Sequence, residues 1–260
     1  MTDREKARYT FGDSAPAAAR LAQVARVFAP TTAAFVTRAA RAPGRVLDLG
    51  CGPGHTTRLL AGAFPDAMIE GLDRSDAFLE EARRAGPSGV RFVRADVATS
   101  PLPGAPADLV FARFVLSHLP ARADVLRTWL GALAIGGVLA VEEVDRIDTD
   151  DPVFAEYLGI TSGLMADRGG ELYVGPEVGA TARALGGRLV EDAPATVAPA
   201  TAEIAGIFAL NLKSWREDPW VVAHHGARLD ALASGLRERE TASGDGRIRW
   251  TLRQVAIARD

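Results

Sequence analysis

Short apolar runs alternate with stretches of helical periodicity through the first 145 residues of the chain. The apolar runs predict five buried strands, at Arg45–Leu49, Ala67–Leu72, Val90–Arg94, Asp108–Ala112 and Val138–Val144. The periodic stretches predict helices between them, at Thr56–Phe64, Ser75–Arg84 and Ala121–Leu133. This β/α rhythm favours a doubly wound, Rossmann-like α/β fold, in which helices cover both faces of a parallel sheet.

The second half of the chain is less regular and predicts a helical cap. Helices are expected at Pro152–Met165, Pro176–Leu185, Ala200–Trp215 and Pro219–Arg239, and strands at Arg188–Val197 and Ile248–Ile257. Further helical segments precede the first strand. We therefore expect one domain over residues 1–260, with an N-terminal helical lid at 1–40, a core at 45–145 and cap helices at 151–185 and 200–240.

The composition is that of an ordinary globular protein, with 48% hydrophobic and 24% charged residues among 260 and a net charge of −3. This balance argues against nucleic-acid binding, which needs a concentrated excess of Lys and Arg. No apolar run approaches the roughly 20 residues that span a bilayer, and the first residues do not resemble a signal peptide. The single cysteine, Cys51, suits a reducing compartment. We expect a cytoplasmic protein that acts on a small molecule, without a nucleic-acid or membrane partner.

A glycine-rich loop follows the first predicted strand, in the run from Val46 to Gly54. Closely spaced glycines let a ligand approach the backbone because no Cβ intervenes. The dinucleotide fingerprint is G-x-G-x-x-G, whereas this run is G-x-G-x-G, with Pro53 inside it and His55 after it. The departure weighs against NAD, and no Gly-Lys-Ser/Thr follows to make a phosphate-binding P-loop.

Acidic residues stand at or near the ends of three successive predicted strands. They are Asp48, Asp73 and Asp96. Ligands of doubly wound sheets bind just outside the carboxyl ends of the strands, where a carboxylate can accept hydrogen bonds from the hydroxyls of a ribose. Three such positions predict a nucleoside-binding site at this edge of the sheet.

With these motifs, residues 40–145 resemble the class I S-adenosylmethionine-dependent methyltransferases. The resemblance rests on the glycine run, on Asp73, on Ala95-Asp96-Val97, and on the strand that begins at Asp108 and leads to Leu119. It implies S-adenosylmethionine as cofactor, S-adenosylhomocysteine as product, and a seventh strand that runs antiparallel to the rest. It also implies a set of cofactor contacts: Asp48, Gly50 and Gly52 at the methionine end, Asp73 and Arg74 at the ribose, Asp96 and Val97 at the adenine, and Arg113 and Phe114 near the sulfonium.

The N-terminal segment resembles that of small-molecule members of this family. Tyr9-Thr10-Phe11-Gly12-Asp13-Ser14 precedes a predicted helix that carries Arg20. The resemblance implies that Arg20 binds the carboxylate of the cofactor, through the bidentate contact that a guanidinium can make. It further implies that Tyr9 lines the reaction centre.

Two further residues are candidates for catalysis. His118 follows the fourth strand, and an imidazole accepts protons near neutral pH. Glu142 and Glu143 end the fifth strand, and strand alternation predicts that one of the two carboxylates points inward; we take Glu142 as the candidate. No metal site is expected, because the adjacent His224 and His225 diverge on a helix.

The cap segments hold most of the large apolar and aromatic side chains. They are Phe154, Tyr157, Met165, Tyr173, Phe208, Leu212, Trp215 and Trp220. A pocket beneath them suits an aromatic or indole-like natural product, a secondary metabolite that would be methylated by in-line SN2 displacement. Ordinary core packing explains the same spacing for most of them. Asn211 and Trp215 lie one helical turn apart, so one face of their helix offers both a hydrogen bond and stacking.

Two other functions fit the same motifs. One is a protein of this fold that binds S-adenosylmethionine without methylating, as a cyclase or for structural use of the cofactor. The other is an NAD-linked oxidoreductase, which the loop spacing disfavours. The sequence leaves open N-, O- or C-methylation, the acceptor and the oligomeric state.

Overall fold

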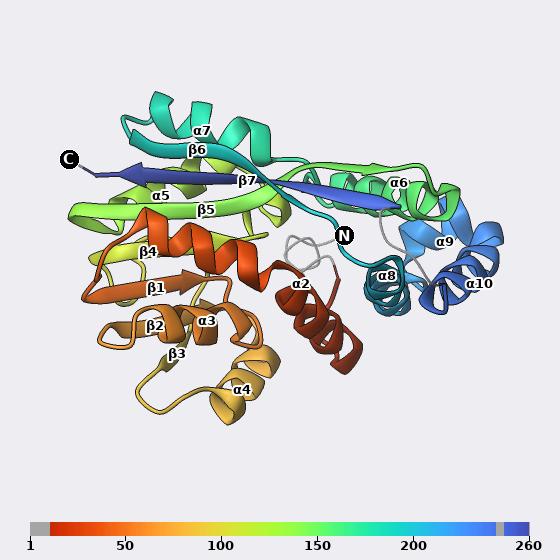
Figure 1. The fold of residues 1–260 in the computed structure, drawn as a ribbon, viewed down its shortest axis with the longest axis horizontal. Helices are drawn as coiled ribbons and strands as arrows, with labels where there is room; N and C mark the ends of the chain where they lie inside the picture. The colour runs from red at the N-terminus through yellow and green to blue at the C-terminus, as the bar shows by residue number, and fades with distance from the viewer. Residues whose placement is uncertain (1–10, 243–246, 260) are drawn as a thin grey trace.

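A seven-stranded mixed sheet forms the centre of the computed structural model, which describes residues 11–242 and 247–259 (Figure 1). The strands are β1 (Arg45–Leu49), β2 (Met68–Asp73), β3 (Arg91–Arg94), β4 (Ala107–Arg113), β5 (Leu133–Thr149), β6 (Arg188–Val197) and β7 (Ile248–Ala258). Their order is β3-β2-β1-β4-β5-β7-β6, with β1 to β5 parallel and β7 antiparallel to both of its neighbours. The predicted Rossmann-like sheet with an antiparallel last strand is confirmed.

Strand alternation divides the apolar side chains between two cores. Val46 belongs to the core under α2 (Ala15–Ala39) and α3 (His55–Ala63), whereas the next residue, Leu47, belongs to the core under α5 (Arg122–Gly131) and α7 (Gly175–Ala184). Helix α4 (Asp76–Ala85) packs beside β3. Helices therefore cover both faces, as the near-continuous apolar strands predict.

The helical cap stands beyond the carboxyl ends of the parallel strands (Figure 1). It consists of α6 (Pro152–Asp167), α8 (Thr201–Trp215), α9 (Pro219–His225) and α10 (Leu229–Glu240), with short 3₁₀ turns η1 (Leu116–His118) after β4 and η2 (Gly226–Arg228) between α9 and α10. A third core joins these helices to the far ends of β5 and β7 and includes Phe154, Phe208 and Leu252. The cap thus closes over the edge of the sheet where ligands of such folds bind.

Two elements differ from the expected boundaries. Strand β5 begins before Val138, because Leu133 pairs with Ala107 of β4, and it continues past Val144, because it pairs with β7 as far as Thr149. The helix expected over residues 219–239 is divided at Gly226, where the chain turns so that α10 packs against α6 and α8. Long-range packing sets both boundaries, and local periodicity does not report it.

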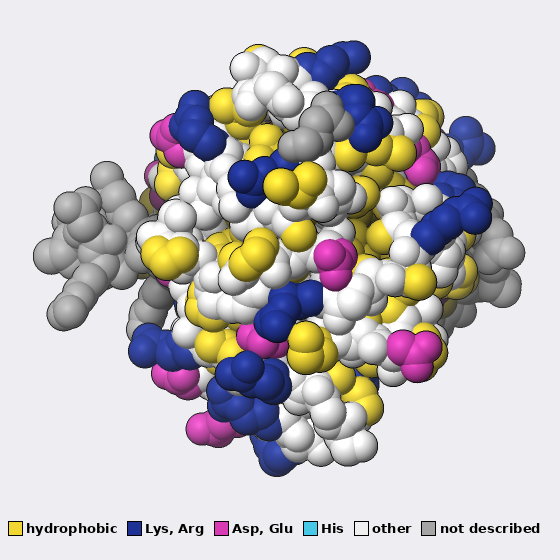
Figure 2. All heavy atoms as spheres, turned by 90° about the vertical axis from the view of Figure 1, so that its left-hand side faces the viewer, with side chains coloured by type: hydrophobic (Ala, Val, Ile, Leu, Met, Phe, Trp, Pro, Cys, Tyr) yellow, Lys and Arg dark blue, Asp and Glu magenta, His cyan; other side chains and the backbone are white. Residues whose placement is uncertain are grey.

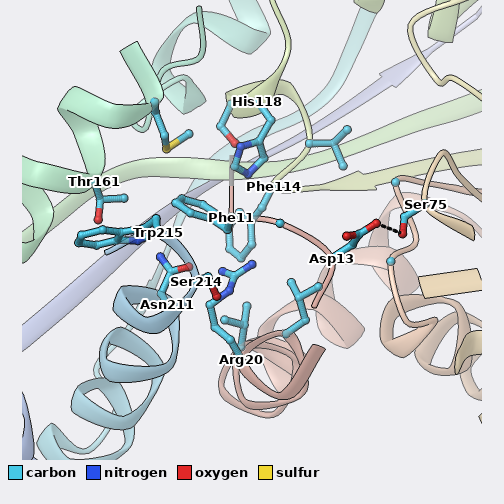
Figure 3. A pocket seen from close by; sticks show the side chains of 18 of the residues that line it. Phe11, Asp13, Arg20, Ser75, Phe114, His118, Thr161, Asn211, Ser214 and Trp215 are labelled. Carbon is cyan, nitrogen blue, oxygen red and sulfur yellow. Dashed lines mark hydrogen bonds between the residues drawn. The ribbon is translucent and has the colours of Figure 1, made fainter. Parts of the chain in front are cut away.

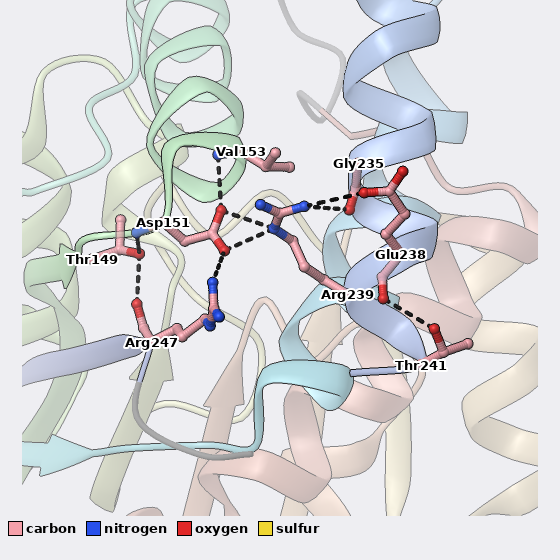
Figure 4. Close-up of polar contacts among 8 residues, drawn as sticks. All are labelled: Thr149, Asp151, Val153, Gly235, Glu238, Arg239, Thr241 and Arg247. Carbon is pink, nitrogen blue, oxygen red and sulfur yellow. Dashed lines mark hydrogen bonds and ion pairs between the residues drawn. The ribbon is translucent and has the colours of Figure 1, made fainter. Parts of the chain in front are cut away.

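The buried carboxylate of Asp151 joins helices α6 and α10 of the cap to the segment that leads into β7 (Figure 4). Asp151 caps α6 by accepting a hydrogen bond from the backbone N–H of Val153 at 2.9 Å. Both of its oxygens also accept from Nε of Arg239 on α10, at 2.8 and 2.7 Å, and one pairs with Arg247 ahead of β7 at 3.2 Å. Asp151 is 1% exposed. One side chain therefore fixes the start of α6, the end of α10 and the approach to β7.

The opposite end of the molecule, where the parallel strands begin, has a mixed surface (Figure 2). Lys and Arg side chains on this face are interspersed with acidic and apolar ones and do not gather in one patch. Among the described helices, none is long and apolar enough to cross a membrane. A cavity lies at the opposite end of the sheet, beneath the cap.

Candidate active site

A cavity of about 1150 Å³ lies between the carboxyl ends of the strands, helix α2 and the cap (Figure 3). Its volume exceeds the roughly 300–1,000 Å³ of a site for one drug-sized ligand. The glycine loop and the ends of β2, β3 and β4 line one part, and α6 and α8 line the other. The cavity therefore has room for two molecules in contact.

The glycine loop presents its backbone to the cavity. Gly50 and Gly52 adopt left-handed conformations, with φ of 65° and 51°, and both line the cavity. A Cβ on Gly50 would lie 2.7 Å from Cγ2 of Val115, so a larger residue does not fit there. Helix α3 begins directly after the loop, with its first-turn N–H groups at this edge of the sheet.

Asp73 ends β2 beside this loop. Its two oxygens accept hydrogen bonds from the backbone N–H groups of Gly52 and Ser75, at 2.8 and 2.9 Å. Burial raises the pKa of Asp73, while these hydrogen bonds act in the opposite direction. Asp96 and Val97 line the cavity after the next strand. The strand ends thus bring a carboxylate and an apolar surface to the same part of the cavity.

Asp48 lies behind the loop and is not among the described residues that line the cavity. One of its oxygens accepts from the hydroxyls of Thr56 and Thr57, both at 2.6 Å. Burial raises its pKa to about 6, against the effect of those two hydrogen bonds. Because it binds the first turn of α3, Asp48 supports the loop and does not face the ligand space.

Glu142 is buried under helix α2, outside the cavity lining of the described residues. Its carboxylate accepts from Oγ1 of Thr32 at 2.5 Å and from Nε2 of Gln254 at 2.6 Å. Arg113 donates to the same threonine hydroxyl at 3.1 Å. Glu142 therefore does not line the acceptor part of the cavity, because α2 covers the face of β5 on which Glu142 stands.

Glu143, on the other face of β5, holds the segment that carries His118. One of its oxygens accepts from the backbone N–H groups of Val115 and Leu116, both at 2.7 Å. Burial raises the pKa of Glu143 to about 7. The two adjacent glutamates thus shape the site from outside it, one through α2 and one through the turn after β4.

His118 lies at the centre of the cavity lining (Figure 3). Its ring packs edge-on against Phe11, with centroids 5.3 Å apart, and the guanidinium of Arg20 lies over the same phenyl ring at 5.0 Å. Burial, together with the positive charges of Arg20 and Arg74, lowers the pKa of His118 to about 3. The imidazole is consequently neutral at physiological pH.

The cap part of the cavity is aromatic, with a few polar atoms. Tyr157 stacks on Phe208 with a centroid separation of 3.8 Å, and its hydroxyl oxygen accepts from Nδ2 of Asn211 at 2.5 Å. Trp215 and Trp250 complete this wall. The far end of the cavity therefore suits a flat or apolar molecule.

Comparison with known proteins places the fold and the loop in one family. Residues 46–137 match the model of a methyltransferase domain. The trans-aconitate 2-methyltransferase of Methylobacterium nodulans is 51% identical over 107 residues, 41% of each chain. That of Methylobacterium radiotolerans is 38% identical over 195 residues, which is 74% of this chain and 65% of the relative. Residues 46–137 form a class I, S-adenosylmethionine-dependent methyltransferase domain.

The alignments span less than two thirds of the length of both relatives. A solved structure with the same fold is that of the [4+2]-cyclase SpnF, with a TM-score of 0.56, 20% identity, and coverage of 88% of this chain and 80% of that one. At this identity the likeness concerns the fold alone. The methyltransferase fold therefore spans more of the chain than the matched domain.

The residues of this methyltransferase domain fit its cofactor. The loop backbone at Gly50 is open to the cavity and leaves no space for a Cβ, the carboxylate of Asp73 stands at the strand end, and Arg20 supplies a cation within the same lining. Ten of the cofactor-binding and catalytic residues predicted from the sequence line the cavity: Arg20, Gly50, Gly52, Asp73, Arg74, Asp96, Val97, Arg113, Phe114 and His118. Asp48 and Glu142 do not, and Tyr9 lies outside the described residues.

Thr161 and Trp250 are among the cavity-lining residues that the sequence analysis did not predict. Thr161 follows Tyr157 by four residues on α6, so helical spacing could have placed it on the same face. Trp250 lines the cavity from β7. Among the described residues, no group of three or more His, Cys, Asp or Glu side chains is arranged to hold a metal ion.

Proposed function

We propose that the protein transfers the methyl group of S-adenosylmethionine to a small organic acceptor bound under the cap. The single observation that carries this proposal is the two-part cavity, in which a glycine loop with strand-end carboxylates opens directly onto an aromatic chamber. The similar trans-aconitate 2-methyltransferases are named for a small-molecule acceptor, which supports a metabolite over a macromolecule as the acceptor of this protein. An aromatic or indole-like natural product fits the chamber wall of Tyr157, Phe208 and Trp215.

The chain's own residues bind and orient the reactants in this proposal. Bound cofactor supplies a methyl group already activated by a sulfonium, so the protein needs chiefly to align the acceptor with it. Asp73 accepts hydrogen bonds from the ribose hydroxyls, Arg20 binds the carboxylate, and Val97 packs on the adenine. Proximity and orientation lower such barriers by about 7–11 kcal/mol in favourable cases.

His118 contacts the acceptor as a neutral imidazole in this scheme. A pKa of about 3 makes its ring a weak proton acceptor, so an acceptor that arrives with a free lone pair suits the site better than one that must lose a proton first. Carboxylates and neutral amines satisfy this condition. Glu142 acts only through Thr32 and α2, and Tyr9 stays a prediction for the reaction centre.

The first test is calorimetric titration of the purified protein with S-adenosylhomocysteine and, separately, with NAD. We expect micromolar binding of the first ligand alone, followed by mass gain of one methyl group in a screen of aromatic and carboxylic acceptors. The substitution Asp73→Ala should weaken binding of S-adenosylhomocysteine by ten- to a hundredfold, about 1.4–2.8 kcal/mol, through loss of two hydrogen bonds. Asp76→Ala is the matched control, because Asp76 is an exposed residue paired with Arg94.

Each other outcome points to a different function. Unchanged affinity in Asp73→Ala would remove that residue from the site, and binding of NAD alone would revive the oxidoreductase. The cyclase that shares the fold supports one further candidate, a protein that binds the cofactor without methylating. That candidate predicts binding of S-adenosylhomocysteine and no mass gain with any acceptor.

A further inference from the structure

Three buried side chains in the cap part of the cavity carry polar atoms that have no hydrogen-bond partner in the described part of the chain. They are Oγ1 of Thr161, Oδ1 of Asn211 and Nε1 of Trp215. The three residues are 4%, 3% and 2% exposed, and all of them line the cavity. Figure 3 shows them together at one end, with Asp13 and Ser75 at the other. Folded proteins pair nearly all of their buried polar groups, so these three atoms, together with Nε1 of Trp250 on the same wall, point to a ligand.

Packing fixes the direction in which these atoms point. Asn211 donates its amide N–H to the hydroxyl of Tyr157 at 2.5 Å, so its carbonyl oxygen is left for a partner that donates. Tyr157 is itself held by stacking on Phe208. Trp215 offers an N–H donor, and Thr161 offers a hydroxyl that donates or accepts. The group that satisfies all three atoms must both donate and accept hydrogen bonds.

The charges around this end of the cavity disfavour an anionic ligand. Its lining includes the carboxylates of Asp167, Glu217 and Asp218 but one guanidinium, that of Arg168, among the described cap residues. Arg168 is already ion-paired with Asp218. The guanidinium of Arg20, also in the lining, is assigned to the carboxylate of the cofactor. A second or third carboxylate on the acceptor would therefore meet negative charge and an acceptor oxygen without a further cation of the cap to balance it.

We propose that Thr161, Asn211 and Trp215 form a subsite for an uncharged hydrogen-bonding group of the acceptor, a carboxamide or a hydroxyl, remote from the atom that is methylated. The acceptor is then an aromatic or apolar molecule with such a group, and a polycarboxylate such as trans-aconitate does not fit. This inference rests on the proposed function and narrows its acceptor.

The test is calorimetric titration of the protein saturated with S-adenosylhomocysteine, using 3-phenylpropanamide, 3-phenylpropanoate and trans-aconitate as probes. We expect the amide to bind at least tenfold more tightly than the other two. Thr161→Val, Asn211→Leu and Trp215→Phe should each weaken the binding of the amide about five- to tenfold. Ser214→Ala is the matched control on α8, because Ser214 lines the cavity but its hydroxyl already donates to the carbonyl of Leu210.

Each outcome supports or overturns either the subsite or the proposed function. The affinity for S-adenosylhomocysteine should be equal in all variants, which also shows that each is folded. Tighter binding of either carboxylate, no binding of the amide, or three variants within twofold of the wild type would overturn the subsite. Loss of S-adenosylhomocysteine binding by the wild type would instead overturn the proposed function.

Discussion

Removal of the Asp151 carboxylate tests how much its hydrogen bonds and ion pairs contribute to the stability of the cap on the sheet. In Asp151→Ala, α6 loses its N-cap, which contributes about 1 kcal/mol, and Arg239 loses a partner while 18% exposed. Breaking a buried ion pair costs about 3–5 kcal/mol, and the lower end applies because Arg239 keeps its hydrogen bond to Gly235. We therefore expect a loss of about 4 kcal/mol from the two effects together. The unfolding entropy of about 2.1 cal/mol/K per residue converts this loss to about 7 °C in Tm.

Thermal and urea unfolding, followed by circular dichroism, measure this change. Asp148→Ala is the matched control, because Asp148 pairs with Arg146 at the surface and both side chains are at least half exposed. Its effect should stay below about 1 kcal/mol. Equal losses in the two variants would refute the role of Asp151.

The pH dependence of unfolding in a further variant, Asp151→Asn, supplies a second readout. Burial alone would raise the pKa of Asp151, but the hydrogen bonds from Arg239 and Val153 outweigh it, and the pKa lies below the ordinary 3.8. A lowered carboxyl pKa stabilises the fold above 3.8, and this contribution is lost as pH falls through the lowered value. The stability gap between wild type and Asp151→Asn should therefore narrow as pH drops below 3.8. A gap independent of pH would contradict this assignment.

Two further predictions concern the residues around His118. Because the pKa of Glu143 is raised from 4.5 to about 7, the folded state binds the proton more tightly, so the free energy of unfolding should fall as pH rises from 4.5 to 7. Glu143→Gln should flatten that decline in urea titrations, and an unchanged slope would argue against the buried carboxyl as its source. Since the pKa of His118 is about 3, His118→Asn should change kcat by the same factor at every pH from 5 to 9. An inflection near pH 6.5 in the wild type that the variant lacks would show that His118 titrates there.

The strand-end rule accounts for what the sequence predicted well. Asp73 and Asp96 were placed at a ligand edge because parallel strands end together, and both line the cavity. The strand Arg188–Val197 also follows from its local pattern, whereas the antiparallel direction of the last strand was implied by the resemblance to the methyltransferase family. These features depend on short segments and on the topology that they imply.

Glu142 and the unpartnered polar atoms of the cap show where prediction from the sequence fails. Strand alternation predicts that the side chains of Glu142 and Glu143 point to opposite faces of the sheet, but it does not predict which face a helix covers. Helix α2 covers the face of Glu142, through a hydrogen bond between Thr32 and Glu142, which lie 110 positions apart in the sequence. The unpartnered atoms of Thr161 and Asn211 likewise arise from the docking of α6 on α8. No local pattern reports a contact between α6 and α8, which α7 and β6 separate along the chain.

The placement of the tryptophans gives the protein an optical signal of its own. Three of its four tryptophans, Trp215, Trp220 and Trp250, line the cavity. The fourth, Trp129, is fully buried on α5, with its indole N–H donated to the carbonyl of Val97 at 2.8 Å. Indole emission depends on the polarity and quenching of its surroundings, so filling the chamber must alter most of the fluorescence. Acceptor libraries can therefore be screened on the unlabelled protein, before any reaction product is known.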